Sequence, residues 1–168
     1  YMSWDAEVTL KMYHLLTDYR IYWFEDVLTP DHLDALAALR PQLTPVLLAG
    51  GEHDFSHHSF ADLARTGALG LWQPDLTWCG GLTAGLRILD LARAHRIPVC
   101  PHRGGEIWSL HLIAATDCMD LADSGYTPIA PEMPHYCVEA QRLSGRAGDP
   151  RLCLPAPRST CLRYRRSM

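Results

Sequence analysis

The stretch "IYWFEDVLTPDHLDALAALR", residues 21–40, joins an apolar run, a turn and an amphipathic segment. The run at residues 21–25 has the length and the β-branched and aromatic content of a strand, and it ends in Glu25. Residues 30–39 begin with proline and predict a helix. Its expected inward side chains are Leu33, Leu36 and Leu39. The stretch is therefore one strand followed by one helix.

The same order recurs on both sides of this stretch. Further strand-like runs occupy residues 46–50, 70–74, 97–101 and, less clearly, 118–121. Helical patterns occupy residues 5–18, 56–66, 82–95 and 106–115. The strands begin at intervals of about 25 residues, each followed by a helix. Because the runs are apolar throughout, we expect parallel strands that are covered on both faces, as in α/β proteins.

Two of the predicted helices carry more detailed signals. In residues 5–18 the apolar side is expected to contain Val8, Met12, Leu15 and Leu16. The helix at residues 56–66 is expected to begin after a capping Ser56 and to end at Gly67.

Two α/β architectures fit this order, a doubly wound sheet and a (β/α)₈ barrel. A nucleotide-binding sheet would be expected to show GxGxxG or GxxxxGK[ST] after its first strand, and neither motif follows residues 21–25. We therefore predict a partial (β/α) TIM-type barrel, about the second half of the barrel.

The chain divides into two parts of different composition. Residues 1–124 carry 8 basic and 16 acidic side chains, whereas residues 125–168 carry 7 and 3. The second part also contains half of the 12 prolines and has no extended periodicity. We predict a barrel part at 1–124 and an irregular Arg- and Pro-rich tail at 125–168, with at most one short helix near 138–143.

Composition excludes several classes of protein. With 48% apolar and 20% charged residues the chain is globular. A net charge of −4 argues against binding nucleic acid, and no apolar run is long enough to cross a membrane. The six cysteines form no CxxC motif, which favours reduced thiols and a cytoplasmic location. The sequence starts with Tyr1 rather than Met, so we expect a piece of a longer protein.

The predicted strands end in residues suited to chemistry. Glu25 closes the first strand, and Glu52, Asp75 and His102 follow the next three. In a barrel the carboxyl ends of the strands meet at one mouth, where active sites lie. The two glutamates are oxygen ligands suited to Mg²⁺. An Asp75–His102 pair would make a general base, and a metal together with a base is suited to removing a proton next to a carboxylate.

Each of these residues also has a plain structural interpretation. Glu25 could be an acid favoured by a helix dipole, Glu52 a loop acid, Asp75 a turn residue after a proline, and His102 a structural residue. Their joint placement after four successive strands favours function.

A histidine-rich segment offers a zinc site as a further alternative. His53, His57 and His58 lie close together around Asp54, with HxxxH spacing. The segment crosses a loop-to-helix junction, and no Glu follows His53 as it does in metalloproteases. We therefore expect His53 to face a substrate and His57 and His58 to lie on a helix surface.

Four segments together resemble the mandelate-racemase-like branch of the enolase superfamily, in particular its acid-sugar dehydratases of the rhamnonate type. The segments are "YWFEDVLTPDHLDAL", "GGEHDFSHHSF", "QPDLTWCGGLT" and "VCPHRGGEIWSLHLIAA". The resemblance covers about residues 1–124. It implies a Mg²⁺-dependent lyase that removes a proton next to a carboxylate, forms an enediolate and loses the β-hydroxyl of a sugar acid.

The resemblance also implies roles for individual residues. Glu25 and Glu52 match the second and third metal ligands, Asp75 and His102 match the catalytic dyad, and His53 matches a substrate contact. The first metal ligand, an aspartate, is expected before Tyr1.

Two further substrate contacts follow from the resemblance. Asp123 stands where the family usually has a glutamate, and Arg103 follows the dyad histidine. The implied partners are a sugar-acid substrate and, in the complete protein, further copies of the same chain. The alternative is an inactive truncated remnant, or a fragment that only supports an oligomer.

Overall fold

The computed structural model describes residues 1–19, 21–102 and 107–116. Its strands are β1 (Trp23–Glu25), β2 (Leu47–Gly50) and β3 (Leu71–Trp72), which pair in parallel in the order β1-β2-β3. Its α-helices are α1 (Ala6–Leu15), α2 (Leu33–Leu39), α3 (His57–Thr66), α4 (Gly81–His95) and α5 (Ile107–Ala115). Two 3₁₀ helices, η1 (Thr17–Tyr19) and η2 (Arg40–Leu43), complete the elements. The predicted α/β alternation is confirmed.

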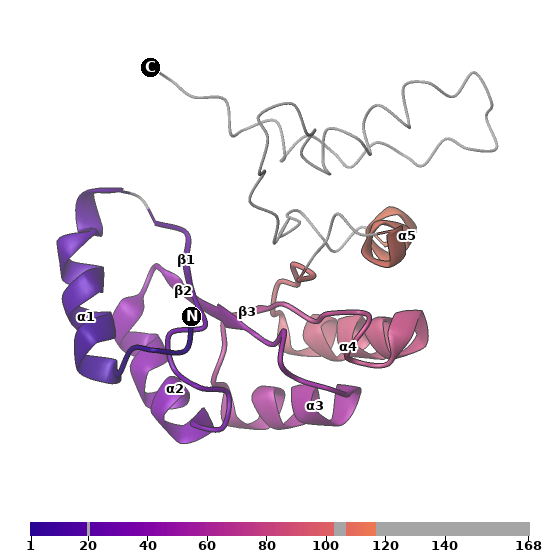
Figure 1. Ribbon diagram of the computed structural model, residues 1–168, viewed down its shortest axis with the longest axis horizontal. Coiled ribbons are helices and arrows are strands. Elements are labelled where there is room, and N and C mark those ends of the chain that lie inside the picture. The colour runs from indigo at the N-terminus through magenta and orange to yellow at the C-terminus, as the bar shows by residue number, and fades with distance from the viewer. Residues whose placement is uncertain (20, 103–106, 117–168) are drawn as a thin grey trace, which may run out of the picture.

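The helices follow one side of the strands in an arc from α1 to α5 (Figure 1). Phe24, Leu48 and Trp72 point to the helix side and belong to the main apolar core. The opposite face of the sheet carries a smaller apolar cluster of Ala49, Leu71 and Cys100, flanked by Trp23 and Leu47. Within the described residues the helices lie on one side of the strands, and Ala49, Leu71 and Cys100 on the opposite face are buried as well, so both faces of the strands are covered as expected. This one-sided arrangement also differs from a doubly wound sheet.

The fourth predicted strand lies beside β3 without forming a regular ladder. Residues 97–102 make two isolated parallel bridges, Trp72 with Val99 and Asp75 with His102. The amide of Cys100 donates to the carbonyl of Trp72 at 2.8 Å. The segment thus continues the parallel arrangement and brings His102 next to Asp75.

Local signals in the sequence placed most helix ends correctly. The hydroxyl of Ser56 accepts from the amide of His58, and Gly67 ends α3 in the left-handed conformation with φ +67°. Asp5 caps α1 by accepting from the amide of Val8 at 2.8 Å. Helix α2 is shorter than predicted, because the three residues from Pro30 form a turn before Leu33.

The buried side of α1 differs from the prediction. Val8 and Leu15 are 38% and 63% exposed, whereas Thr9 is fully buried and Leu16 packs on the core. At 3.6 residues per turn, Thr9 and Leu16 lie roughly a third of a turn away from Val8 and Leu15. Helix α1 is anchored through Tyr13, whose hydroxyl donates to the carbonyl of Thr44 at 2.9 Å. This hydrogen bond and the packing of Leu10, Tyr13 and Leu16 on the core accompany a rotation of the helix that the apolar pattern did not predict.

Several predictions fall outside the described residues. These are the strand at 118–121, the tail at 125–168 and its possible helix at 138–143. The partial barrel and the domain division at residue 124 also stay predictions. Among the residues that the structure does describe, no helix combines the length and apolarity needed to cross a membrane.

Shortening one buried leucine and one exposed leucine to alanine tests which side chains belong to the core. We expect Leu48→Ala to lower the free energy of unfolding by about 2–5 kcal/mol, because Leu48 is fully buried between sheet and helices. The control Leu15→Ala should change it by about 0.5 kcal/mol or less. Urea denaturation measures both, and equal losses would contradict this assignment of the core.

Candidate functional site

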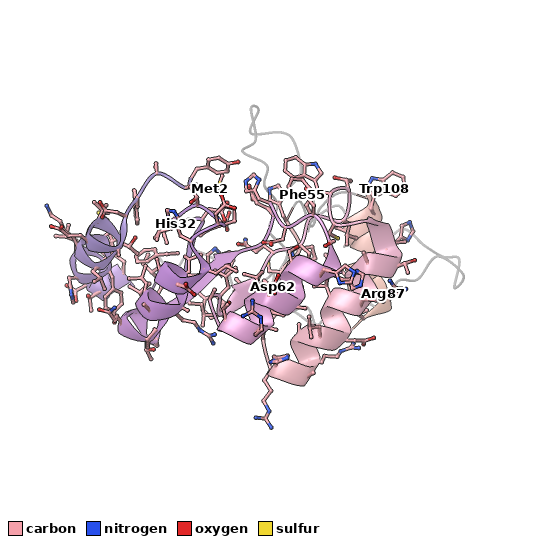
Figure 2. The ribbon with its side chains drawn as sticks, turned by 90° about the horizontal axis from the view of Figure 1, so that it is seen from below. Met2, His32, Phe55, Asp62, Arg87 and Trp108 are labelled. Carbon is pink, nitrogen blue, oxygen red and sulfur yellow. The ribbon has the colours of Figure 1, made fainter. Side chains whose placement is uncertain are left out.

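The carboxyl ends of the strands meet at one edge of the sheet. Glu25 is the last residue of β1, Glu52 lies two residues after β2, and Asp75 lies three residues after β3. Because the strands are parallel, these residues and His102 come to the same edge. Side chains from distant parts of the sequence, including Met2, Phe55 and Trp108, lie along this edge in Figure 2.

Asp75 and His102 form the pair that the sequence predicts. Nδ1 of His102 lies 2.9 Å from Oδ2 of Asp75, and because a carboxylate only accepts, Nδ1 carries the donated proton. The other oxygen of Asp75 accepts from the amide of Thr77 at 2.8 Å and from its hydroxyl at 2.6 Å. Burial alone would raise the pKa of Asp75, but the hydrogen bonds from Thr77 and His102 outweigh it and hold the pKa below its ordinary value.

Glu52 joins the two histidines of the site. Its Oε2 lies 3.0 Å from Nε2 of His102, and its Oε1 lies 3.0 Å from Nε2 of His53. Glu52 is only 8% exposed. The imidazole of His102 is therefore placed between two carboxylates, with Asp75 on Nδ1 and Glu52 on Nε2.

Glu25 is held by two donors that sequence reasoning did not identify as part of the site. Its Oε2 accepts from Nε2 of Gln73 at 2.6 Å and from Nε1 of Trp23 at 3.0 Å. Trp23 stands two residues before Glu25 and so shares its face of the strand. Gln73 precedes "PD" in the quoted motif, and its place two residues before Asp75 is the signal that could have found it.

Asp26 is a second site residue that the sequence reading missed. Its side chain is 10% exposed, and its Oδ2 lies 4.0 Å from Nε2 of His53. Asp26, Glu52 and His53 can each place one ligand atom within 4.8 Å of the others. Burial, followed by repulsion from Glu52 and Glu25, raises the pKa of Asp26 to about 6. Its position directly after Glu25 was the available signal.

The chemistry of these donors fits a divalent cation. Burial and then repulsion from Glu52 and Glu25 raise the pKa of Asp26, so negative charge is concentrated at this edge. Oδ2 of Asp26 is buried without a hydrogen-bond partner among the described residues. A cation would relieve both the repulsion and the unsatisfied oxygen, and oxygen donors suit Mg²⁺.

The other residues predicted from the sequence have different outcomes in the structure. Aromatic rings surround His53: the hydroxyl of Tyr1 lies 2.7 Å from its Nε2, and the ring of Trp78 lies 5.6 Å from its own. His57 and His58 are in α3 and do not join the group of potential ligands around Glu52 within the described residues, so the zinc interpretation gains no support. Arg103 and Asp123 lie outside the described residues.

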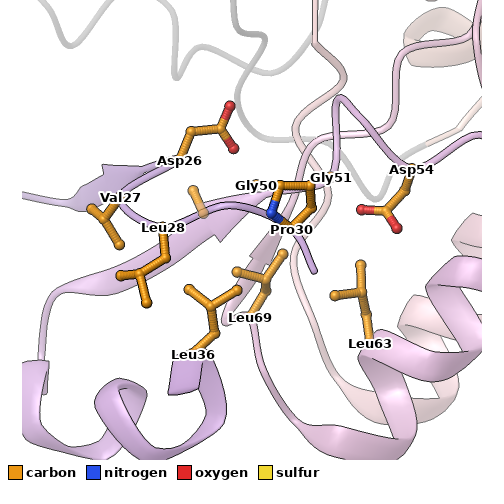
Figure 3. Close-up of a pocket in the computed structure, with 11 residues that line it drawn as sticks. Asp26, Val27, Leu28, Pro30, Leu36, Gly50, Gly51, Asp54, Leu63 and Leu69 are labelled. Carbon is orange, nitrogen blue, oxygen red and sulfur yellow. The ribbon is translucent and has the colours of Figure 1, made fainter. Parts of the chain in front are cut away.

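A second acidic side chain lies behind the site. Asp54 and Asp26 line a cavity of about 20 Å³, close to the space of one water molecule. Figure 3 shows Asp26 directed away from the leucine side chains that form the other wall. Burial raises the pKa of Asp54 to about 6, although a hydrogen bond from Ser59 acts in the opposite direction.

Comparison with known proteins identifies relatives of the whole described region. The profile of the family described as "Enolase C-terminal domain-like" matches residues 1–143. L-rhamnonate dehydratase of Saccharopolyspora erythraea is 33% identical over 114 residues, which cover 67% of this chain and 29% of that protein. The chain therefore spans less than a third of the length of this relative.

Solved structures agree with the sequence match. L-rhamnonate dehydratase from Gibberella zeae superposes with a TM-score of 0.70 at 32% identity, covering 78% of this chain and 33% of that one. A structure of rhamnonate dehydratase from the same organism, complexed with Mg, gives a TM-score of 0.66 at 32% identity over 73% of this chain and 30% of that one.

The contribution of Thr77 to the dyad can be measured directly. Thr77→Val removes the hydroxyl donor but keeps the shape of the side chain and the amide donor, so we expect the pKa of Asp75 to rise. Carboxyl-carbon NMR during a pH titration reports this pKa, and Thr77→Ser should leave it near the wild-type value. An unchanged pKa in Thr77→Val would show that the hydroxyl does not stabilise the carboxylate.

The buried Asp54 should make stability depend on pH. Because its pKa is higher in the folded chain than in the unfolded one, its stabilising contribution is full below about pH 4 and is lost as the pH rises through about 6. We expect Asp54→Asn to stabilise the fold at pH 7.5 by about 1 kcal/mol and to lose this advantage towards pH 4. Denaturation at several pH values measures the effect, with the exposed Asp90→Asn as control. A gain independent of pH would contradict it.

Proposed function

Because this chain belongs to the enolase C-terminal domain-like family, we propose that it is the part of a Mg²⁺-dependent acid-sugar dehydratase that carries the catalytic dyad. The observation that supports this proposal most strongly is the placement of His102. Its imidazole is held by Asp75 on one nitrogen, and its other nitrogen faces the proposed metal ligand Glu52. A general base next to a cation site is what proton removal beside a carboxylate requires.

Glu25 and Glu52 are the proposed ligands of the cation. Among the described residues Glu52 groups with Asp26 and His53 within 4.8 Å, whereas Glu25 lies outside this group and is proposed on its resemblance to the family's second ligand. The relatives of the family include a rhamnonate dehydratase crystallised with Mg. A bound Mg²⁺ would supply positive charge where the substrate carboxylate gains electron density. A first ligand from the part of the protein before Tyr1 would complete the set.

His102 performs the proton transfers in this proposal. With Nδ1–H donating to Asp75, the neutral imidazole presents Nε2 as the base when the carboxylate of Glu52, 3.0 Å away, binds a cation instead of accepting a proton from Nε2. Nε2 takes the proton from the carbon next to the substrate carboxylate. The same nitrogen then returns a proton to the β-hydroxyl, which leaves as water. The enol that remains rearranges to a 2-keto-3-deoxy acid, so atoms and charge balance.

The substrate class follows from the relatives and from the rim of the site. We propose a sugar acid of the rhamnonate type, which His53 contacts beside Tyr1 and Trp78. Arg103 and Asp123 remain predicted substrate contacts, and assembly into a homo-oligomer remains a prediction for the complete protein. No observation on the described residues favours the alternative of an inactive remnant.

Activity assays on the protein at its natural full length test this function. We expect Mg²⁺-dependent conversion of L-rhamnonate or a stereoisomer to a 2-keto-3-deoxy product, detected as its semicarbazone, and its loss when the metal is removed with EDTA. His102→Asn should lower kcat by about 10²–10⁴-fold, because it removes the base.

The matched control is His58→Asn, on the exposed side of α3, which should keep wild-type kcat. Failure to convert any member of a panel of sugar acids would refute the dehydratase proposal. Full activity of His102→Asn would refute the role of His102 alone.

A further inference from the structure

We propose that Gln73, together with Trp23, is a positioning residue that fixes Glu25 as a one-oxygen ligand of the cation. The inference rests on the proposed function, because it takes Glu25 to be a metal ligand. It adds two residues that hold this ligand and specifies which of its oxygens faces the metal.

Hydrogen-bond chemistry fixes which end of the Gln73 carboxamide faces Glu25. A carboxylate can only accept hydrogen bonds, so the amide nitrogen of Gln73, and not its oxygen, must face Glu25. The resulting contact between Nε2 and Oε2 is 2.6 Å long and couples a residue just after β3 to the last residue of β1. Gln73 is 1% exposed and Glu25 is exposed, so the hydrogen bond is shielded from water on the side of the glutamine.

Both donors bind the same oxygen of Glu25. Nε1 of Trp23 reaches Oε2 at 3.0 Å, from the same face of β1. No hydrogen bond from a described residue reaches Oε1. The two donors therefore orient the carboxylate group and leave Oε1 as the atom that can bind a cation.

The type of donor also matters for the charge of the site. The amide and the indole are neutral, so they orient Glu25 without cancelling its negative charge. A lysine or arginine in the same place would orient the carboxylate but would compete with a cation for it. Residues that support a metal ligand typically orient it through hydrogen bonds, as Gln73 and Trp23 orient Glu25.

The backbone beneath Gln73 is held rigidly. Its amide donates to the carbonyl of Gly50 at 2.8 Å, and a Cβ atom on Gly51 would lie 3.3 Å from the same nitrogen. Gly51 has φ +118°, a conformation that side chains rarely adopt. The loop after β2 therefore packs directly against the residue that orients Glu25.

The carboxamide oxygen of Gln73 gives a second, independent observation. Oε1 is buried and has no hydrogen-bond partner among the described residues. A buried amide oxygen without a partner is costly, so this glutamine is not explained by its contribution to stability. Among the described residues, the side chain of Gln73 makes one hydrogen bond, to Glu25, which assigns it to the site.

Cation affinity measures the proposed role without relying on turnover. In the protein at its natural full length, Gln73→Met keeps the shape of the side chain but removes the donor. We expect Mg²⁺ to bind about 10-fold more weakly in isothermal titration calorimetry, as is usual when a residue that supports a metal ligand is lost. The matched control is Gln42→Met in η2, whose side chain donates to the carbonyl of Ala38 away from the site. It should bind Mg²⁺ with wild-type affinity.

Two more variants keep the test decisive. Trp23→Phe removes the indole donor but keeps an aromatic side chain, and it should also weaken Mg²⁺ binding. Circular dichroism shows whether each variant folds. If Gln73→Met does not fold, the affinity of Trp23→Phe tests the positioning role. Glu25→Gln should weaken binding more than either variant. If Glu25→Gln has wild-type affinity, the proposed metal site fails. If Glu25→Gln binds weakly but Gln73→Met and Trp23→Phe bind as the wild type does, the positioning role alone is overturned.

Discussion

Parallel pairing of the strands is the constraint on which the rest of the structure depends. The register of Glu25 with Ala49, and of Ala49 with Leu71, places the three strand ends at one level. Residues separated by about 25 positions in the sequence thereby become neighbours, and the bridge between Asp75 and His102 extends the series to a fourth segment. The helices on the other side need only bury the opposite face of each strand. On β1 the alternation places Phe24 in the main core and Glu25 on the opposite face, which on β2 and β3 carries the apolar Ala49 and Leu71.

The concentration of negative charge at this edge has visible consequences. Asp75 is buried at 2% exposure, yet its pKa lies below the ordinary value, because Thr77 and His102 supply hydrogen bonds. Asp26 has no comparable donors, and its pKa rises to about 6. Burial favours the neutral form of both aspartates. Hydrogen-bond donors reverse this effect at Asp75 but not at Asp26. The carboxylate of Asp75 is satisfied by hydrogen bonds within the protein, whereas the carboxylates around Glu52 remain suited to a cation.

The carboxylates of the site are oriented by hydrogen-bond donors from neighbouring residues. Gln73 and Trp23 orient Glu25, and Thr77 orients Asp75. In each case a hydrogen bond occupies one oxygen of a carboxylate and leaves the other for its partner. Gly51 allows the loop after β2 to approach Gln73 closely. The precision of the site therefore depends on packing between neighbouring strand ends as much as on the residues that perform chemistry.

The sequence by itself determined the alternation of strands and helices, the caps at Ser56 and Gly67, and the set Glu25, Glu52, Asp75 and His102. These features depend on local periodicity, on the conformational preferences of single residues and on the rule that parallel strands end at one edge. Only the tertiary structure decided which stripe of α1 is buried. The apolar pattern predicted Val8, Met12, Leu15 and Leu16, whereas Thr9 is buried beside Leu16, and Val8 and Leu15 are exposed. The tertiary structure also decided that Asp26, Gln73 and Trp23 belong to the site. Their roles arise from distances between side chains on different strands, and no local pattern specifies those distances.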